Sequence, residues 1–186
     1  MTGAPTHQLF WFASRAFGII AMLLLGISVA VGLAMSGRLM HRPGIAAKLR
    51  HFHESATLVT LGLIVAHAGA LLFDSYLRPG LVGITVPFTL AYRPLYTGVG
   101  IVAAWLAAIL GLSFYARKRI GVRTWRSMHR FTIVAYVLAL VHVVGSGTDV
   151  RSPWMLALLT GLTAPIAFAF TYRMLPGTRR RGQPAT

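Results

Sequence analysis

The feature that most constrains this chain is a series of five long apolar segments that carry almost no charge. They cover roughly residues 11–35, 53–77, 95–116, 128–147 and 154–175. A helix needs ~20 apolar residues to cross the hydrocarbon core of a bilayer, and each segment is about that long or longer. Of the 186 residues, 56% are hydrophobic and 11% are charged, which is typical of a membrane protein. The sequence therefore predicts an all-α polytopic bundle of five transmembrane helices in a lipid bilayer.

The basic residues predict how these helices are oriented. The chain has 18 Lys and Arg residues against 3 Asp and Glu residues. Such a balance in a soluble protein would suggest nucleic-acid binding, but here the cations lie between apolar segments, so we expect no nucleic-acid partner. They gather in the 36–52 and 117–126 segments, which we expect to be loops, and in the tail. The positive-inside rule then places the N-terminus outside and the C-terminus in the cytoplasm, with the chain in the plasma (cell) membrane. The first segment is longer than a signal-peptide core and is expected to be retained.

Two of the apolar segments carry a histidine near each end. His53 and His67 are fourteen residues apart, and His129 and His142 are thirteen apart. Fourteen residues fall within ~40° of four helical turns and span ~21 Å, so the first two share a helix face near opposite sides of the bilayer. Both segments are expected to run from inside to outside. His53 then matches His129 in depth, and His67 matches His142.

Imidazoles paired at two depths favour two iron porphyrins. Ionisable residues inside a membrane are costly and usually functional, and neutral imidazole is a standard axial ligand of haem iron. Histidines ~20 Å apart cannot share a structural zinc ion, which needs four clustered ligands. The chain has no cysteine, so thioether attachment is excluded and the haem would be bound non-covalently. The simpler alternative is that each histidine is a hydrogen-bonded bundle residue.

Helical phase raises two questions about these histidines. His51 is sixteen residues from His67 and ~160° out of phase with it, so His53 is the better candidate ligand. Thirteen residues leave His129 and His142 ~140° apart on a straight helix. Either that helix is distorted, or the two cofactors lie on different flanks of it.

Haem propionates would need cationic partners, and arginine suits carboxylates. The candidates on the inner side are Arg50, Arg126 and Arg130, and those on the outer side are Arg78 and Arg93. Charge that serves topology alone is the alternative for each of them.

Arg15 lies inside the first segment, beside Trp11 and Phe12. It either extends to the interface or faces the outer cofactor, where it would meet a propionate or an electron acceptor. The 78–94 segment contains three prolines and is not expected to span. It would form an interfacial loop or a lid over the outer site.

The three acidic residues indicate no hydrolytic site. Glu54 is expected in the first turn of the second helix, where negative charge is favourable, and Asp74 and Asp149 are expected to be solvated at the outer ends. They form no carboxylate pair, and the chain has no glycine-rich nucleotide motif.

Two motifs in this chain resemble the ferric reductase-like transmembrane domain family, over about residues 11–175. They are Phe52-His53…His67 and Trp125-Arg126-Ser127-Met128-His129-Arg130…His142. The family includes NADPH oxidases, ferric reductases and the haem-bearing membrane subunit of bacterial methionine-sulfoxide reductase systems. The resemblance implies two b-type haems, the inner one held by His53 and His129 and the outer one by His67 and His142. It also implies a place near the outer haem for Arg15.

The chain departs from this family in two respects. Members commonly have six helices rather than five, and oxidases and ferric reductases carry a cytoplasmic flavin and nicotinamide domain after the last helix. We expect residues 1–176 to form one transmembrane bis-histidine di-haem domain and residues 177–186 to be a disordered basic cytoplasmic tail. Flavin or quinone chemistry would enter only through a partner, a separate flavoprotein reductase or quinol.

The expected function is that of a transmembrane b-type cytochrome. It would move electrons from a cytoplasmic-side donor through two bis-histidine haems to an outer-side acceptor, as an oxidoreductase subunit. Two alternatives stay open. One is a non-redox membrane scaffold or transporter subunit with structural histidines, and the other is a quinone-linked cytochrome that feeds a partner enzyme.

Overall fold

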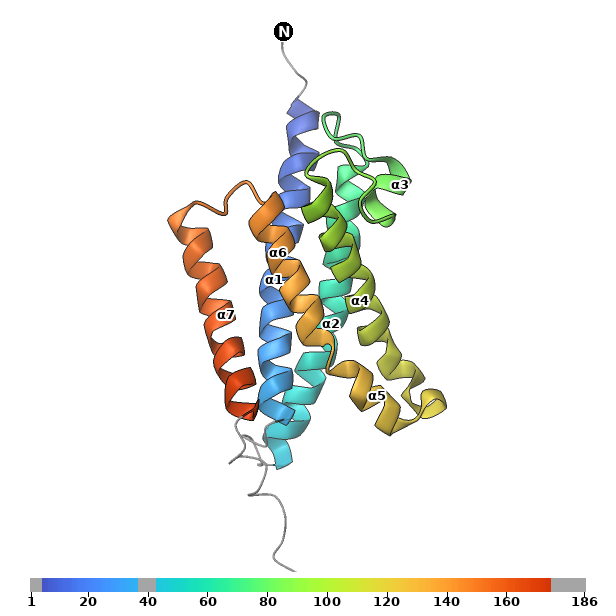
Figure 1. Ribbon diagram of the computed structural model, residues 1–186, viewed down its shortest axis with the longest axis vertical. Helices are drawn as coiled ribbons and strands as arrows, with labels where there is room; N and C mark the ends of the chain where they lie inside the picture. The colour runs from blue at the N-terminus through green and yellow to red at the C-terminus, as the bar shows by residue number, and fades with distance from the viewer. Residues whose placement is uncertain (1–4, 37–42, 175–186) are drawn as a thin grey trace, which may run out of the picture.

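The computed structural model describes residues 5–36 and 43–174, and all the regular elements in these ranges are helices. In chain order they are α1 (Pro5–Ser36), α2 (Pro43–Leu71), α3 (Gly80–Thr85), α4 (Pro94–Ile120), α5 (Val122–His129), α6 (Thr132–Ser146) and α7 (Pro153–Met174) (Figure 1). Five helical stretches are long and apolar enough to cross a membrane, with α5 and α6 counted as one stretch. The prediction of an all-helical protein with five such stretches is confirmed.

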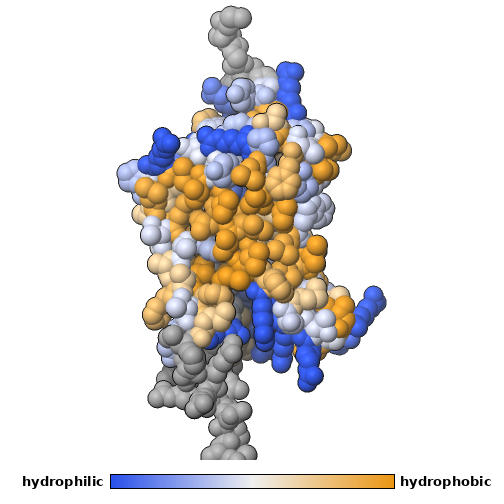
Figure 2. Space-filling view, in the orientation of Figure 1, coloured by the Kyte–Doolittle hydropathy of each residue, from blue (hydrophilic) through white to orange (hydrophobic). Residues whose placement is uncertain are grey.

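The lateral surface of the bundle is apolar. Large hydrophobic side chains point outward, among them Val65, Trp105 and Phe168. Figure 2 shows an apolar belt between hydrophilic ends on the face that it displays. Exposed apolar surface of this extent is a liability in water but is the normal condition of a helix surface in lipid. The structure thus matches a multi-pass membrane protein.

The helices pack as two antiparallel pairs. α1 lies along α2, and α4 lies along α6, while α7 packs on the other side of α1 (Figure 1). α2 and α6 carry three of the four candidate histidines, yet these two helices are not closely packed against each other. The histidine side chains therefore lie between the two helix pairs.

A buried apolar cluster joins α1, α6 and α7. Its members are Met22, Val29, Tyr136, Met155, Leu159 and Ile166. Tyr136 is 1% exposed, and its hydroxyl lies 2.9 Å from the Thr163 hydroxyl of α7. This cluster fixes α7 to the bundle and leaves the faces between α2, α4 and α6 to the histidines.

The second helix does not have the predicted ends. It begins at Pro43 rather than at His53, so Lys48 and Arg50 lie on helix and not in a loop. Proline suits the first turn of a helix because the missing N–H would have no intrahelical partner there. The helix ends at Leu71 rather than at residue 77, and the Asp74 carboxylate accepts hydrogen bonds from the backbone N–H groups of Tyr76 and Leu77. The prediction that Asp74 is solvated is wrong, because it is buried within this turn.

The predicted 117–126 loop is also largely helical. α4 continues to Ile120, and α5 starts at Val122. The two helices meet at Gly121, whose φ of 89° favours glycine. Cations in the last turn of α4 interact favourably with the helix dipole, which explains why the helix extends through them.

The fourth membrane-crossing stretch is broken between α5 and α6. Residues 130 and 131 form a turn, and α5 leans away from α6 at this point (Figure 1). A straight helix could not aim His129 and His142 at one neighbour. The break shows that distortion, one of the two alternatives left by the sequence, is what this chain adopts.

The 78–94 segment does not span, as predicted, and contains the short helix α3. It folds against α4, where the Trp105 indole donates a 2.9 Å hydrogen bond to the Thr85 carbonyl. Arg93 at its end has a positive φ of 43° and donates to the Gly145 carbonyl of α6. The predicted basic residues at 38 and 42 and the predicted tail at 177–186 lie outside the described residues.

We expect Tyr136→Ala to destabilise the bundle by ~3–5 kcal/mol, because it removes a buried aromatic ring. Tyr136→Phe should cost only ~0.5–1.5 kcal/mol, since it deletes one hydrogen bond. Unfolding of the purified protein in detergent measures both changes. Phe168→Ala, at a side chain 74% exposed, is the control, and equal stability of the two alanine variants would contradict this description of the core.

Candidate cofactor site

The structure brings the four candidate histidines together in two facing pairs. His67 of α2 and His142 of α6 have ring centroids 6.3 Å apart and ring planes at 78°. His53 of α2 and His129 of α5 have ring centroids 6.0 Å apart and ring planes at 87°. We call the first the upper pair and the second the lower pair, after their places in Figure 1. These are the histidines that the sequence placed at matching depths.

The ring separation in both pairs suits one metal ion between two imidazoles. With metal–nitrogen bonds of ~2 Å and each nitrogen ~1 Å from its ring centre, two opposed imidazoles have centres ~6 Å apart. Within residues 5–36 and 43–174, no group of three or more His, Cys, Asp or Glu side chains could hold a metal ion. The described residues thus offer no four-ligand set of the kind that structural zinc needs. Two axial nitrogens and no other protein ligand is the ligand set of a bis-histidine haem.

Three of the four imidazoles are fixed by backbone carbonyl groups of a neighbouring helix. His67 Nδ1 lies 2.7 Å from the Ser14 carbonyl oxygen, and His53 Nδ1 lies 3.0 Å from that of Ser28. On the other side of the bundle, His142 Nδ1 lies 2.9 Å from the Tyr96 carbonyl oxygen.

A carbonyl can only accept a hydrogen bond, so Nδ1 carries the proton in each of these three rings. The Nε2 atom then keeps its lone pair, which is the tautomer of a metal ligand. Among the described residues, no hydrogen bond involves Nε2 of any of the four histidines. The nitrogens that a metal would bind are thus free.

Two buried serines on α1 reinforce this arrangement. Ser14 Oγ lies 3.0 Å from His67 Nδ1, and Ser28 Oγ lies 2.9 Å from His53 Nδ1. The serines are fourteen residues apart, as are His53 and His67 on the antiparallel helix α2. The sequence reasoning missed these residues, although the equal spacing was a usable signal.

A glycine faces each of the three fixed rings. A Cβ atom on Gly18 would lie 2.9 Å from His67 Nδ1, and one on Gly32 would lie 3.3 Å from His53 Cε1. A Cβ atom on Gly100 would overlap the His142 ring. Each glycine is four residues after the residue whose carbonyl holds the ring, one helical turn further along the same face. One turn of helix thus supplies both the acceptor and the space for the imidazole.

His129 departs from this pattern. Its Nδ1 is buried and has no hydrogen-bond partner among the described residues. The Leu110 carbonyl, fourteen residues after Tyr96, is a candidate partner but is not in hydrogen-bond geometry. Position 114, one turn later, is occupied by a phenylalanine rather than a glycine.

Trp125 of α5 covers His129 instead. The two rings stack with centroids 5.1 Å apart and planes at 28°. The Trp125 indole Nε1 is also buried without a partner within the described part of the chain. A buried N–H group without a partner costs ~1–3 kcal/mol, and the described residues leave this cost uncompensated at His129 and Trp125.

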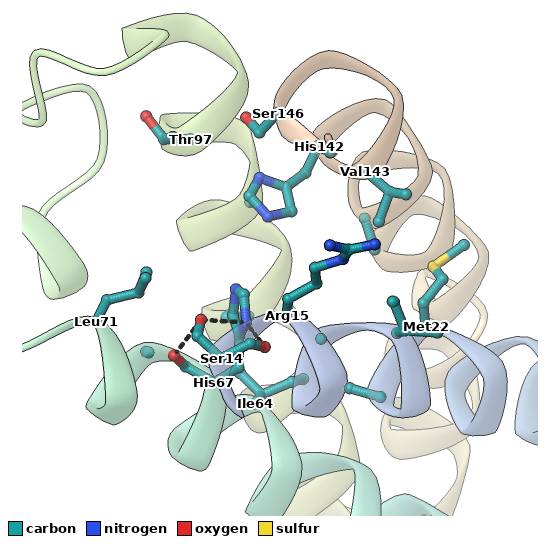
Figure 3. A pocket seen from close by; sticks show the side chains of 18 of the residues that line it. Ser14, Arg15, Met22, Ile64, His67, Leu71, Thr97, His142, Val143 and Ser146 are labelled. Carbon is teal, nitrogen blue, oxygen red and sulfur yellow. Dashed lines mark hydrogen bonds between the residues drawn. The ribbon is translucent and has the colours of Figure 1, made fainter. Parts of the chain in front are cut away.

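A cavity of about 530 Å³ lies beside the upper pair (Figure 3). This volume is within the usual range of ~300–1,000 Å³ for cofactor sites. Apolar side chains of α1, α4 and α6 form most of its wall, and Ser14, Arg15, His67, His142 and Asp149 are among the polar residues that line it. The segment after α2 also contributes. Its cavity-lining residues are Tyr76, Leu77, Gly83, Ile84, Leu90 and Tyr92.

Arg15 lines this cavity (Figure 3), and its predicted contact with a haem propionate or an electron acceptor stays a prediction. Arg15 forms an ion pair with Asp149 of the α6–α7 connection and lies over the Trp11 ring at 5.1 Å. Asp149 was predicted to be solvated, and that prediction is wrong because its side chain is only 17% exposed and is paired. A compensated charge therefore borders the upper pair.

The other predicted cationic residues have different positions. Arg93 contacts the Gly145 carbonyl and the Tyr92 ring. Arg50, Arg126 and Arg130 are exposed at the lower end, and their role toward a propionate stays a prediction.

Two further predictions concern residues near His53. Glu54 is not in a first turn but in the middle of α2, where it accepts a 2.9 Å hydrogen bond from the Tyr115 hydroxyl. His51 is exposed, and its Nδ1 lies 3.4 Å from the Ser55 hydroxyl of its own helix, so the choice of His53 over His51 as a ligand stays a prediction.

We expect Gly100→Ala to destabilise the protein by ~1–3 kcal/mol, because the new methyl group must displace the His142 ring. Gly62→Ala on α2, where nothing lies within 4 Å, should instead be neutral or stabilising by up to ~1 kcal/mol. Thermal unfolding of the two variants in the same detergent compares them. Equal stability would show that Gly100 does not make room for the imidazole.

No protein-family model, curated protein or solved structure matches this chain. The resemblance to the ferric reductase-like family therefore rests on the histidine spacing and its sequence context.

Proposed function

We propose that this protein is a transmembrane b-type cytochrome with two haems, each held by one histidine of α2 and one of the α5–α6 stretch. The observation that carries this proposal is the pair of facing imidazoles, 6.0 and 6.3 Å apart at their centroids, with free Nε2 atoms. His53 and His129 would hold the lower haem, and His67 and His142 the upper one. When bound, haem supplies a one-electron ferric–ferrous couple at each depth.

The features around the rings support haem over a bare metal ion. Two imidazoles alone would leave a metal ion undercoordinated, whereas a porphyrin supplies the remaining ligands in one plane. The glycines leave room for the imidazoles within each helix pair, and the apolar cavity beside the upper pair leaves room for a flat cofactor. The absence of cysteine from the sequence makes the attachment non-covalent. The role of the chain is then to fix ring orientation and tautomer and to exclude water.

We further propose that the upper end faces outward and the lower end faces the cytoplasm. Lys48, Arg50 and the cations around Gly121 lie at the lower end, whereas fewer lie at the upper end. The positive-inside rule supports this orientation in the plasma membrane. Electrons would then enter near the lower pair from a cytoplasmic donor and leave near the upper pair to an outer acceptor.

The same geometry supports membership of the ferric reductase-like family as a proposal. The motif histidines are the ones that face each other, and Arg15 borders the upper cavity. A separate flavoprotein or quinol is the proposed donor. A scaffold with structural histidines is less well supported, because structural roles do not explain four free Nε2 atoms arranged as facing pairs.

Purified protein should contain two haem b per chain. His67→Ala and His142→Ala should each remove the upper haem and leave one, because a single imidazole cannot replace the pair. Quantitative haem extraction, with the reduced-minus-oxidised optical spectrum, measures the stoichiometry. His51→Ala, at an exposed histidine, is the control and should retain two haems. A colourless protein, or unchanged haem content in both ligand variants, would rule out the proposal.

The Arg15–Asp149 pair should set the midpoint potential of the upper haem. Asp149→Asn leaves the Arg15 charge uncompensated and should raise the potential, because positive charge stabilises the reduced iron. Arg15→Gln should lower it. Both shifts should be on the order of tens of millivolts, because a nearby unit charge in a medium of intermediate dielectric contributes ~1–2 kcal/mol. Redox titration tests this, with Arg151→Gln as a control at an exposed arginine nearby. Shifts of the same sign in both variants would contradict the assignment.

A further inference from the structure

A cluster of cations lies next to the lower pair. Arg117, Lys118 and Arg119 occupy the last turn of α4, and Arg123 and Arg126 lie on α5, with Arg130 directly after it. We call this set the basic end. Figure 2 shows hydrophilic side chains projecting from the lower part of the molecule.

α5 links the basic end to the lower pair. Arg123, Arg126 and Arg130 are spaced as residues on one face of a helix, and all three are exposed. The side chains of Trp125 and His129 turn inward instead, and their rings stack 5.1 Å apart. The eight-residue helix α5 thus carries positive charge on its outer face. On its inner face, Trp125 contacts the candidate ligand His129.

In the described part of the chain, no acidic side chain forms an ion pair with a cation of the basic end. The sequence has only three acidic residues, and each has another partner. Glu54 accepts from Tyr115, Asp74 caps the turn after α2, and Asp149 pairs with Arg15. The basic end therefore carries an uncompensated positive potential, which raises the association rate of a negatively charged partner.

We propose that the basic end is the docking surface for a soluble electron-donor protein with an acidic face. This inference rests on the proposed function. Transient redox partners use small interfaces and are steered by complementary charge. With a haem held by His53 and His129, the reduced flavin of such a donor would lose one electron and the ferric iron would gain it, with no atom transferred.

Anionic lipid headgroups could also bind these cations. The contact between Trp125 and His129 favours the protein donor. A protein bound at this surface would be separated from His129 of the lower pair by a single side chain, that of Trp125. Topology charge alone requires no such contact. In addition, α5 is inclined to the bundle axis and lies at the lower end of the molecule (Figure 1).

The test uses the full chain in nanodiscs of phosphatidylcholine, with flavodoxin as the acidic flavoprotein probe. Arg119→Glu combined with Arg123→Glu reverses two exposed charges of the basic end that have no role in the cofactor sites. Lys48→Glu combined with Arg173→Glu makes the same change in net charge at the same end of the bundle, on α2 and α7. Binding of oxidised flavodoxin is measured at low and high ionic strength, and reduction by reduced flavodoxin is timed on the same samples.

We expect wild-type protein and the control to bind flavodoxin equally, and the basic-end variant to bind about ten-fold more weakly at low salt. The difference should shrink at high salt, because screening removes it. Equal loss in both variants, or no salt-dependent binding by wild type, overturns the proposal. So does a basic-end variant that differs from wild type only in the anionic lipid that co-purifies with it.

Haem content of the same samples separates the two proposals. A colourless protein counts against the proposed function. A protein with two haems and equal flavodoxin affinity in all three forms counts against the docking surface alone.

Discussion

The hydrogen bond from an imidazole Nδ1 to a backbone carbonyl of the neighbouring helix is the interaction on which the rest of this structure depends. It joins α2 to α1 at two depths, through Ser14 and Ser28, and it joins α6 to α4 through Tyr96. Inside a membrane no water is available to bond an unpaired polar group, so breaking these hydrogen bonds is costly. They therefore fix both the helix register and the histidine tautomer. The α1–α2 pair thus fixes two imidazoles at two depths, and the α4–α6 pair fixes one. Each of these imidazoles has a free Nε2 atom.

The two ends of the molecule differ in how many of their imidazoles are fixed by such hydrogen bonds. At the upper end both imidazoles are fixed by carbonyl groups, and the ion pair of Arg15 with Asp149 borders the cavity. At the lower end His129 lies at the break between α5 and α6, stacked on Trp125 and without a carbonyl partner among the described residues. The upper site is built for rigidity, whereas the lower one ends in a short helix at the molecular surface. The two sites therefore differ in how their imidazoles are held, although both have one histidine from α2.

The apolar helices could be predicted from the sequence, because a segment that crosses lipid must satisfy its own backbone hydrogen bonds. The apolar segments had to be helices, and the spacing of His53 and His67 gave their shared face directly.

Helix ends were less predictable, since Pro43 starts α2 well before its apolar part and the cations after residue 116 continue α4 as helix. The phase conflict of His129 and His142 was visible in the sequence, but the position of the break was not, because it depends on tertiary contacts around Trp125. The carbonyl groups that accept from the histidines could not be predicted either, because every residue has a carbonyl group. The sequence marks the accepting ones only by Ser14, Ser28 and the glycines one turn later. The partners of Asp74 and Asp149 likewise depend on how the loops fold.

The central claim is that two imidazoles with nearly perpendicular planes bind one haem iron at each end of the bundle. Low-temperature electron paramagnetic resonance of the oxidised protein tests it most directly, because this signal reports both axial ligands and the angle between their planes. The account predicts that all the iron is low-spin ferric haem, with the strongly anisotropic signals of perpendicular imidazoles. High-spin ferric haem as the main species, or a protein without haem iron, would contradict it.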